Sequence, residues 1–478
     1  MVGASKESDP RERPVLGPSR PDEARVLSLN QERLWYLDQL APGSPVYNVP
    51  FVSRLSGAVD ADLLERALNE VVKRHEVLRT VILPVRGTPR PFLLKRWALT
   101  LRQVDLRSWP ESERAEEAAR HVAHLAAEPF DLMRDVMLRC ALIRSTDRQY
   151  IFAHSAPHLA FEGSSTTVLY AELRAIYSAF LHGQPSPLPA LSVQYADFAR
   201  WQRSLLTGER FEMLTRYWRR QLADAPNMQL PLDFPRPGIF TPQGKRHYFS
   251  VPPELLTRAS QWFKEAGVSR YCGLLAVFGA LLFCYTGSRD LCVGSPFGPR
   301  CEGTEHLIGF FVNTVVVRTV LSGEMSFGEV LAQVATTVRE AVAHVDLTFD
   351  KVVAAVQPPR DTSRTPLFQV NFRAPKQPYP CLDLEGVQAA PAEYLDNGTA
   401  KFDLALEIDS THGDACYFEY CTGLFKEASI VEAVADYQQL LAALIEMPAT
   451  PLKQFPAVQD VARTRASRTV GLYNPDCS

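Results

Sequence analysis

The stretch Gln149-Tyr-Ile-Phe-Ala-His-Ser-Ala-Pro-His-Leu-Ala-Phe-Glu-Gly-Ser164 decides how the surrounding fold is interpreted. Residues 149–154 are apolar and strand-like, and a polar turn separates them from a second apolar run at 137–144. Residues 164–181 have the pattern of a helix. The local order is therefore strand, loop and helix, and the loop holds His158.

The loop combines side chains suited to proton transfer. His158 carries an imidazole, a group that in general titrates near neutrality and so suits a general base. The carboxylate of Glu162 follows four residues later and can orient the ring or fix the loop. Gly163 permits a backbone turn that a side chain would forbid. Taken alone, the pattern is unspecific, because a single histidine is more often a core or surface residue.

A metal site is not predicted. His154 and His158 stand four residues apart, but Pro157 between them argues against one continuous helix, and the spacing suggests no third ligand. The nine cysteines form no CxxC pair. GxSxG, Walker-type and GxGxxG loops are also missing from the sequence. We therefore expect neither a metal nor a bound cofactor.

Composition narrows the class of protein. The chain has 478 residues, of which 46% are hydrophobic and 22% charged, and its net charge is −3. That balance suggests neither a nucleic acid nor a membrane surface as partner. The N-terminus lacks the apolar core of a secretory signal, and the cysteine count is odd. A reduced, cytoplasmic α/β protein is the simplest expectation.

The periodicity predicts two halves joined by a proline-rich linker. In the first half, residues 60–74 are expected to form a helix, with Asp60 as N-cap and an apolar stripe of Leu64, Ala67, Leu68, Val71 and Val72. The second half repeats the alternation of helices and strands. The expected parts are a disordered or docking tail (1–25), an N-terminal lobe (26–190), a helical and proline-rich connector (191–244), a C-terminal lobe (245–455) and a C-terminal tail (456–478).

Seven ordered motifs reveal a family resemblance. They begin at Leu27, Arg74, Pro157, Tyr195, Val293, Ile308 and Arg360, and include Leu27-Ser-Leu-Asn-Gln-Glu-Arg-Leu-Trp, Arg74-His-Glu-Val-Leu-Arg-Thr80 and Ile308-Gly-Phe-Phe-Val-Asn-Thr314. From about residue 27 to about residue 455, the chain resembles the condensation domains of nonribosomal peptide synthetases. Residues 157–163 occupy the place of the active-site motif HHxxxDG.

The resemblance implies both a fold and a reaction. The fold is expected to be two chloramphenicol-acetyltransferase-like lobes in a V, with a central tunnel to which carrier proteins bring phosphopantetheine arms. The reaction is expected to move a carrier-bound acyl thioester onto an amine or hydroxyl nucleophile, in nonribosomal peptide or hybrid polyketide biosynthesis. His158 maps onto the catalytic histidine. Glu162 and Arg300 are expected to form a structural ion pair, and the N–H groups near Gly163 to stabilise negative charge.

The sequence departs from the family pattern around this site. Pro157 replaces the first histidine, Glu162 the aspartate, and Ser164 an often larger residue, while Pro299 precedes Arg300 in place of glycine. Pro157, Ser164 and Asn313 are candidate substrate or tunnel residues. The chain is expected to act as a free-standing enzyme and to release a chain as an amide or ester.

Several alternatives stay open. The altered motif favours a non-catalytic domain that recruits another enzyme to a carrier. An acyltransferase of the same superfamily that uses acyl-CoA, or an epimerase-like relative, is also compatible with the sequence. Donor, acceptor, the choice between amide and ester, and oligomeric state are not readable from the residues.

Overall fold

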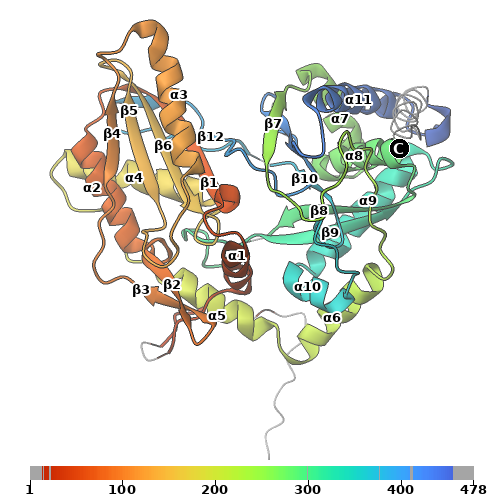
Figure 1. The fold of residues 1–478 in the computed structure, drawn as a ribbon, viewed down its shortest axis with the longest axis horizontal. Coiled ribbons are helices and arrows are strands. Elements are labelled where there is room, and N and C mark those ends of the chain that lie inside the picture. The colour runs from red at the N-terminus through yellow and green to blue at the C-terminus, as the bar shows by residue number, and fades with distance from the viewer. Residues whose placement is uncertain are drawn as a thin grey trace, which may run out of the picture. The chain divides into compact units, whose positions relative to one another are not determined.

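Two α/β units make up the described part of the chain in this computed structural model (Figure 1). The structure describes residues 13, 15–20, 23–298, 300–375, 377–409 and 413–455. Unit 1 contains the described parts of Met1–Met213, Gly298–Val312 and Tyr379–Asn397, and unit 2 those of Leu214–Phe297, Asn313–Pro378 and Gly398–Ser478. Most of the predicted N-terminal tail, the whole predicted C-terminal tail and Pro299 lie outside the described residues.

Unit 1 is built on a six-stranded sheet. Its strand order is β11-β1-β6-β5-β4, with β12 also paired to β1, and all pairs are antiparallel except the parallel pair of β4 and β5. The strands are β1 (Asn48–Gly57), β4 (Leu101–Asp105), β5 (Arg139–Arg144), β6 (Gln149–Pro157), β11 (Val387–Ala389) and β12 (Glu393–Tyr394). A separate hairpin joins β2 (Thr80–Val85) to β3 (Thr88–Leu93).

Helices cover both faces of this sheet (Figure 1). Alternate strand residues point to opposite faces, and they divide between two buried clusters accordingly. The smaller cluster lies under α3, and the larger one includes α2 and α4. The helices of this unit are α1 (Leu29–Leu40), α2 (Ala61–Arg74), α3 (Glu111–Ala127), α4 (Ser165–Leu181) and α5 (Tyr195–Leu205), and α6 (Gly208–Gln221) runs across the boundary at Met213.

The predicted helix at 60–74 is confirmed. Asp60 accepts hydrogen bonds from the first backbone N–H groups of α2, and the five residues of the predicted apolar stripe are its buried residues. The helix predicted at 164–181 is also confirmed, as α4.

Strand β6 is longer than predicted and brings the chain directly to His158. The apolar pattern predicted an end at residue 154, but pairing with β1 continues to the partners Asn48 and Pro157. A proline is tolerated at the end of a strand because its missing N–H removes only one bond there. His158 therefore follows a fixed strand end, and its backbone N–H donates to the carbonyl of Tyr47 at 2.7 Å.

Unit 2 has a second six-stranded sheet, in the order β7-β14-β13-β10-β8-β9. Strands β7 (Gly244–Phe249), β8 (Asp290–Phe297), β9 (Asn313–Val320), β10 (Val370–Arg373), β13 (Leu404–Glu407) and β14 (Cys416–Cys421) form it. Its helices are α7 (Pro253–Glu265), α8 (Arg270–Thr286), α9 (Phe327–Ala343), α10 (Phe349–Val356) and α11 (Glu427–Glu446). The alternation of helices and strands predicted for the second half of the chain is confirmed.

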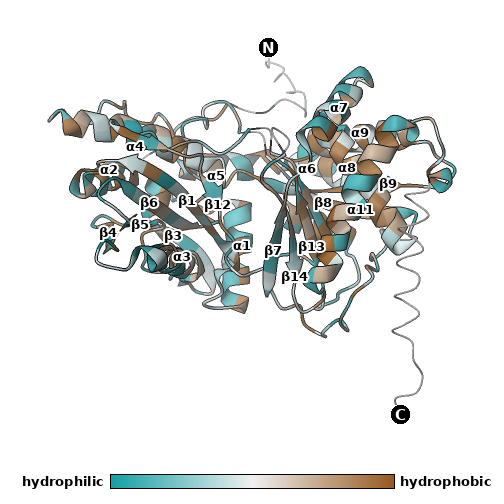
Figure 2. Ribbon diagram, turned by 90° about the horizontal axis from the view of Figure 1, so that it is seen from above, coloured by the Kyte–Doolittle hydropathy of each residue, from teal (hydrophilic) through white to brown (hydrophobic). Residues whose placement is uncertain are grey.

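Two helices of unit 2, α8 and α11, are long and apolar. Helix α8 is buried along most of its length and lies among α7, α9 and α11 (Figure 2). Helix α11 is the one described helix long and apolar enough to cross a membrane, and α7 with α8 passes the same test as a pair bent by 108°. The buried residues of α11 contact α7 and α8, as expected of a core helix.

Candidate active site

The loop after β6 fixes the ring of His158. Its Nδ1 lies 2.9 Å from the carbonyl oxygen of Phe161. Because a carbonyl only accepts, Nδ1 carries the proton and donates it, which assigns the unprotonated position of the neutral ring to Nε2. The ring of Phe310 lies against the imidazole at a centroid distance of 4.4 Å. The half-buried imidazole is thus held in one tautomer and one orientation.

Glu162 binds the backbone of a segment far away in sequence. Its Oε2 accepts the N–H of Phe311 at 2.9 Å and that of Val312 at 2.8 Å. Its other oxygen, Oε1, lies 3.6 Å from the Arg300 guanidinium, and both side chains are largely buried. The sequence-predicted partners Glu162 and Arg300 are therefore brought together within unit 1.

Ser164 completes the link between these two charges. Its hydroxyl donates to Oε1 of Glu162 at 2.5 Å and accepts from the Arg300 guanidinium at 3.0 and 3.3 Å. Arg300 also donates to the carbonyls of Thr304 and Leu307 and lies over the ring of Phe311. Burial lowers the pKa of Arg300, and Glu162 partly offsets this, but a guanidinium stays protonated in proteins. Glu162 and Ser164, which both depart from the family pattern, are therefore hydrogen-bonded to each other.

Other side chains of unit 1 bind the same segment. The N–H of Ile308 donates to Nδ1 of His75, and that of Gly309 to the hydroxyl of Ser165. The hydroxyl of Tyr195 donates to the carbonyl of Phe310 at 2.6 Å, and the amide of Asn30 to that of Val312 at 2.9 Å. With the two bonds to Glu162, four N–H groups between residues 308 and 312 are satisfied by side chains. We call residues 308–312 the strapped segment; it holds Phe310 against His158.

Gly163 packs closely against the side chain of Tyr379. Its φ lies outside the left-handed region that favours glycine. A Cβ at this position would lie 3.2 Å from the hydroxyl oxygen of Tyr379 and 3.3 Å from its ring. The expected turn is present at residues 163–164, but the prediction that its backbone conformation demands glycine was wrong, and the tight contact at this position is with Tyr379.

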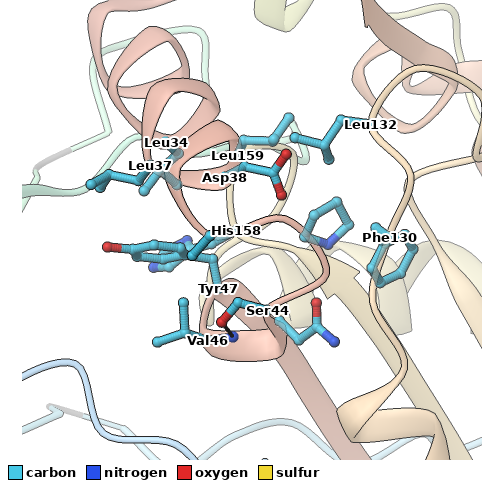
Figure 3. A pocket seen from close by; sticks show the side chains of 13 residues that line it. Leu34, Leu37, Asp38, Ser44, Val46, Tyr47, Phe130, Leu132, His158 and Leu159 are labelled. Carbon is cyan, nitrogen blue, oxygen red and sulfur yellow. Dashed lines mark hydrogen bonds between the residues drawn. The ribbon is translucent and has the colours of Figure 1, made fainter. Parts of the chain in front are cut away.

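A small cavity lies beside the loop (Figure 3). Pro157 and His158 line it together with residues of α1 and of the segment before β1. Its volume is about 30 Å³, which holds a water-sized group. Pro157, a candidate substrate residue, thus faces a cavity, and Ser164 serves the Glu162–Arg300 link.

Asn313 belongs to unit 2, whereas the other candidates belong to unit 1. Its amide donates to the carbonyls of Val345 and Leu347 and accepts from the N–H groups of Thr314 and Phe349. A substrate contact for Asn313 stays a prediction, and such a contact would have to replace one of these bonds.

His154, four residues before His158, is a core residue. Its side chain is fully buried, its ring nitrogens have no hydrogen-bond partner in the described part of the chain, and burial lowers its pKa to about 3. Among the described residues, no group of three or more histidine, cysteine, aspartate or glutamate side chains is placed to hold a metal ion.

Comparisons with known proteins identify the family. The family model of the condensation domain matches residues 22–465. The chain is 38% identical to a linear gramicidin synthase of Brevibacillus parabrevis over 95% of its own length, but it spans only 6% of that relative. The chain belongs to the condensation domain family of nonribosomal peptide synthetases.

Solved structures agree on the fold. The X-domain from teicoplanin biosynthesis is 26% identical, with a TM-score of 0.83 over 92% of this chain and 99% of that domain. The same X-domain solved in complex with OxyB gives a TM-score of 0.81 at 26% identity, over 93% and 98% of the two chains. The mixed α/β fold expected from the family resemblance is confirmed.

Sequence reasoning missed the residues that support the loop. His75 and Asn30 lie inside quoted motifs, but nothing in the sequence relates them to residues 308–312. Tyr379 lies in a segment that carried no motif. Hydrogen bonds from backbone N–H groups leave no signature in the sequence. The contacts of the strapped segment therefore could not be predicted from the sequence.

Proposed function

We propose that this domain is catalytic and moves an acyl group from the phosphopantetheine thioester of a carrier protein onto an amine or hydroxyl. The single observation that carries the proposal is the hydrogen bond from Nδ1 of His158 to the carbonyl of Phe161. A base that removes a proton from the nucleophile needs an unprotonated nitrogen in a fixed direction, and this bond supports Nε2 in that role.

The reaction is a balanced acyl transfer. The nucleophile loses a proton as its nitrogen or oxygen attacks the thioester carbon, and a new C–N or C–O bond forms. The C–S bond then breaks, and the thiolate takes up a proton to leave as the thiol of the arm. A positioned base accelerates such a step by about 10²- to 10⁴-fold.

The start of α4 supplies a second element of this proposal. Among the described residues, no acceptor is hydrogen-bonded to the backbone N–H groups of Gly163 and Ser164. They precede a helix of 17 residues, whose N-terminus carries partial positive charge. We propose that these groups stabilise negative charge that develops on the thioester oxygen.

A second candidate function is recruitment of another protein without catalysis. The likeness to an X-domain that has been solved in complex with OxyB supports it. The replacement of the first motif histidine by Pro157 points the same way. The retained His158 geometry and the Glu162–Ser164–Arg300 link favour catalysis.

One experiment separates the two functions. A carrier protein of the same biosynthetic system is loaded with its acyl group and incubated with the domain and a panel of amines and alcohols, and the carrier is followed by intact mass spectrometry. Catalysis predicts loss of the acyl mass only with nucleophile and wild-type protein, and a drop of at least about 10²-fold with His158→Ala. Equal rates with the variant would contradict the role of His158, and no transfer to any nucleophile would favour recruitment.

A further inference from the structure

Asp38 occupies an unfavourable position at the end of α1. It lies in the last turn of this helix, which contains no basic residue. The C-terminal end of a helix carries partial negative charge, so an ionised carboxylate there is repelled. The carbonyls of Leu37 and Asp38 share a single N–H donor, that of Ala41. Negative potential therefore gathers at this helix end.

The Asp38 carboxylate accepts a hydrogen bond from the neutral amide of Gln39 at 3.1 Å and has no cationic partner among the described residues. Burial raises the pKa of the carboxyl, the amide of Gln39 lowers it, and Asp131 raises it further. In the part of the chain that the structure describes, no lysine, arginine or histidine lies within ion-pair distance of Asp38. The nearby Arg139 lies over the ring of Phe130 and pairs with Asp135.

The carboxylate lines the cavity beside His158. Leu34, Leu37 and Leu132 form apolar walls, and Figure 3 shows the carboxylate of Asp38 and the ring of Phe130 around the same space. A positive group there would be attracted by the carboxylate and by the partial negative charge of the helix end. The negative electrostatic potential in the cavity therefore favours the binding of a cation.

Size and ligand number select the kind of cation. The cavity volume of about 30 Å³ is enough for a compact head group such as an ammonium, whose charge is concentrated on one atom. A divalent metal ion would require about six oxygen ligands, or at least several side chains, and this cavity offers one carboxylate. A primary ammonium group is the cation that fits.

The same electrostatics exclude the reacting amine. A nucleophilic amine must be neutral when it attacks, whereas a neighbouring carboxylate stabilises the protonated form and raises the pKa of an amine. A group seated beside Asp38 is therefore kept charged and unreactive. The cavity suits an ammonium group that is additional to the nucleophile.

We propose that the Asp38 cavity binds a non-reacting primary ammonium group of a substrate, carried either by the acyl donor or by the acceptor. This inference rests on the proposed acyl transfer and adds a substrate class to it: substrates with a basic amino group beside the reacting centre. The Asp38 cavity would then select such substrates over neutral ones of equal length.

Binding of methylammonium tests the cavity without catalysis. Affinities of methylammonium and of methanol are measured by ligand-observed NMR on wild type, on Asp38→Asn and on Asp62→Asn, which neutralises an exposed acid on α2. The proposal predicts that only Asp38→Asn weakens methylammonium binding, by at least tenfold, and that methanol binds no more tightly than methylammonium. Equal affinity in wild type and Asp38→Asn, or no binding to wild type, would overturn it.

Acyl transfer then distinguishes the two sources of the ammonium group. In the donor arm, carrier loaded with 6-aminohexanoyl is compared with carrier loaded with hexanoyl. In the acceptor arm, 1,5-diaminopentane is compared with pentylamine. Asp38→Asn should remove a preference for the charged substrate in one arm, through KM and with kcat changed less than threefold. Transfer without any Asp38-dependent preference would refute the proposal. Absence of transfer with intact methylammonium binding would refute the proposed function alone.

Discussion

Both units bury carboxylates paired with arginines, but they satisfy them in different ways. In unit 1, Glu162 divides its oxygens between the backbone of the strapped segment and the Ser164–Arg300 link. In unit 2, the corresponding charges are paired across neighbouring strands of a single sheet. The comparison separates a carboxylate that positions a loop from carboxylates that hold a sheet together.

The unit 2 cluster follows directly from strand register. Glu419 of β14 stands opposite Arg246 of β7, and Glu407 of β13 stands opposite both Tyr417 of β14 and Arg373 of β10. The Arg246–Glu419 and Arg373–Glu407 pairs are each 3.1 Å long. Burial would raise the pKa of Glu419, but the two arginines outweigh it and hold this pKa below its ordinary value.

The two clusters differ in which backbone segment loses its hydrogen-bond partners when a carboxylate is removed. In unit 2 the partners belong to strands whose backbone bonds remain. In unit 1 the partners include the N–H groups of Phe311 and Val312, which Glu162 alone satisfies among the contacts described above. Loss of Glu162 should therefore release residues that hold Phe310 against His158.

The largest effect is expected for Glu162→Ala. It leaves the buried Arg300 without its carboxylate and two N–H groups without an acceptor, and breaking a buried pair in this way costs about 3–5 kcal/mol. Denaturant unfolding measures the change. Glu324→Ala, which removes an exposed partner of Lys453, is the control and should cost less than about 1 kcal/mol. A soluble, fully active Glu162→Ala protein with unchanged stability would contradict this role.

Ser164→Ala should have the next largest effect. It removes a hydroxyl that bonds two charged groups at once, and a hydrogen bond to a charged group contributes about 1.5–3 kcal/mol. Thermal unfolding and acyl-transfer rates are compared with Ser178→Ala, whose hydroxyl donates to the exposed Glu385. Equal behaviour of the two variants would show that Ser164 does not link Glu162 to Arg300.

His154→Phe should stabilise unit 1. Wild type buries an imidazole without hydrogen bonds in contact with Phe51 and Phe161, and an unsatisfied buried group costs about 1–3 kcal/mol. The folded-state pKa is about 3 against an ordinary 6.5. Above pH 6.5 both states are neutral. Below it only the unfolded chain binds the proton, so stability is lost as pH falls from 6.5 towards 3.

The pH dependence of His154→Phe provides its test. Below about pH 6.5, the unfolding free energy of wild type should fall more steeply than that of the variant, by about 1.4 kcal/mol per pH unit. His124→Phe, at an exposed position of α3, serves as control. Parallel pH profiles for wild type and His154→Phe would mean that His154 does not set this acid sensitivity.

Tyr417→Phe should have the smallest effect and sharpen the comparison. It removes one hydroxyl bond to Glu407 in unit 2 and keeps the ring against Arg246, for a cost of about 1 kcal/mol. Hydrogen exchange at residues 308–312 should not change, whereas Glu162→Ala should accelerate it. Faster exchange in Tyr417→Phe would remove the distinction between the two clusters.

Periodic patterns were sufficient for most of the fold. The stripe of α2 predicted both the helix and its buried face, because amphipathic spacing states which side is covered. Strand β1 was not predicted, since Pro50 and Arg54 interrupt its apolar residues. The assignment of Gly298–Val312 and Tyr379–Asn397 to unit 1 was also not predicted, because no local pattern states which sheet a connecting segment joins.

For the candidate site, the motif supplied residues and the structure supplied their contacts. His158, Glu162 and Arg300 were chosen from their places in ordered motifs. The bridging role of Ser164 was not foreseen, because a hydroxyl between two charges depends on distances of a few tenths of an ångström. The reason for Gly163 was misjudged, because its close neighbour Tyr379 lies more than 200 residues away in the sequence.

The most direct test of the central claim is a double-mutant cycle on single-turnover acyl transfer with His158→Ala and Glu162→Gln. Glutamine keeps the length of the side chain but removes its charge, so folding is checked first by thermal unfolding. If Glu162 acts by positioning His158, the double variant should be no slower than His158→Ala alone, although Glu162→Gln by itself is slower than wild type. Rate losses that simply multiply would contradict this account, because they would mean that the two residues act independently.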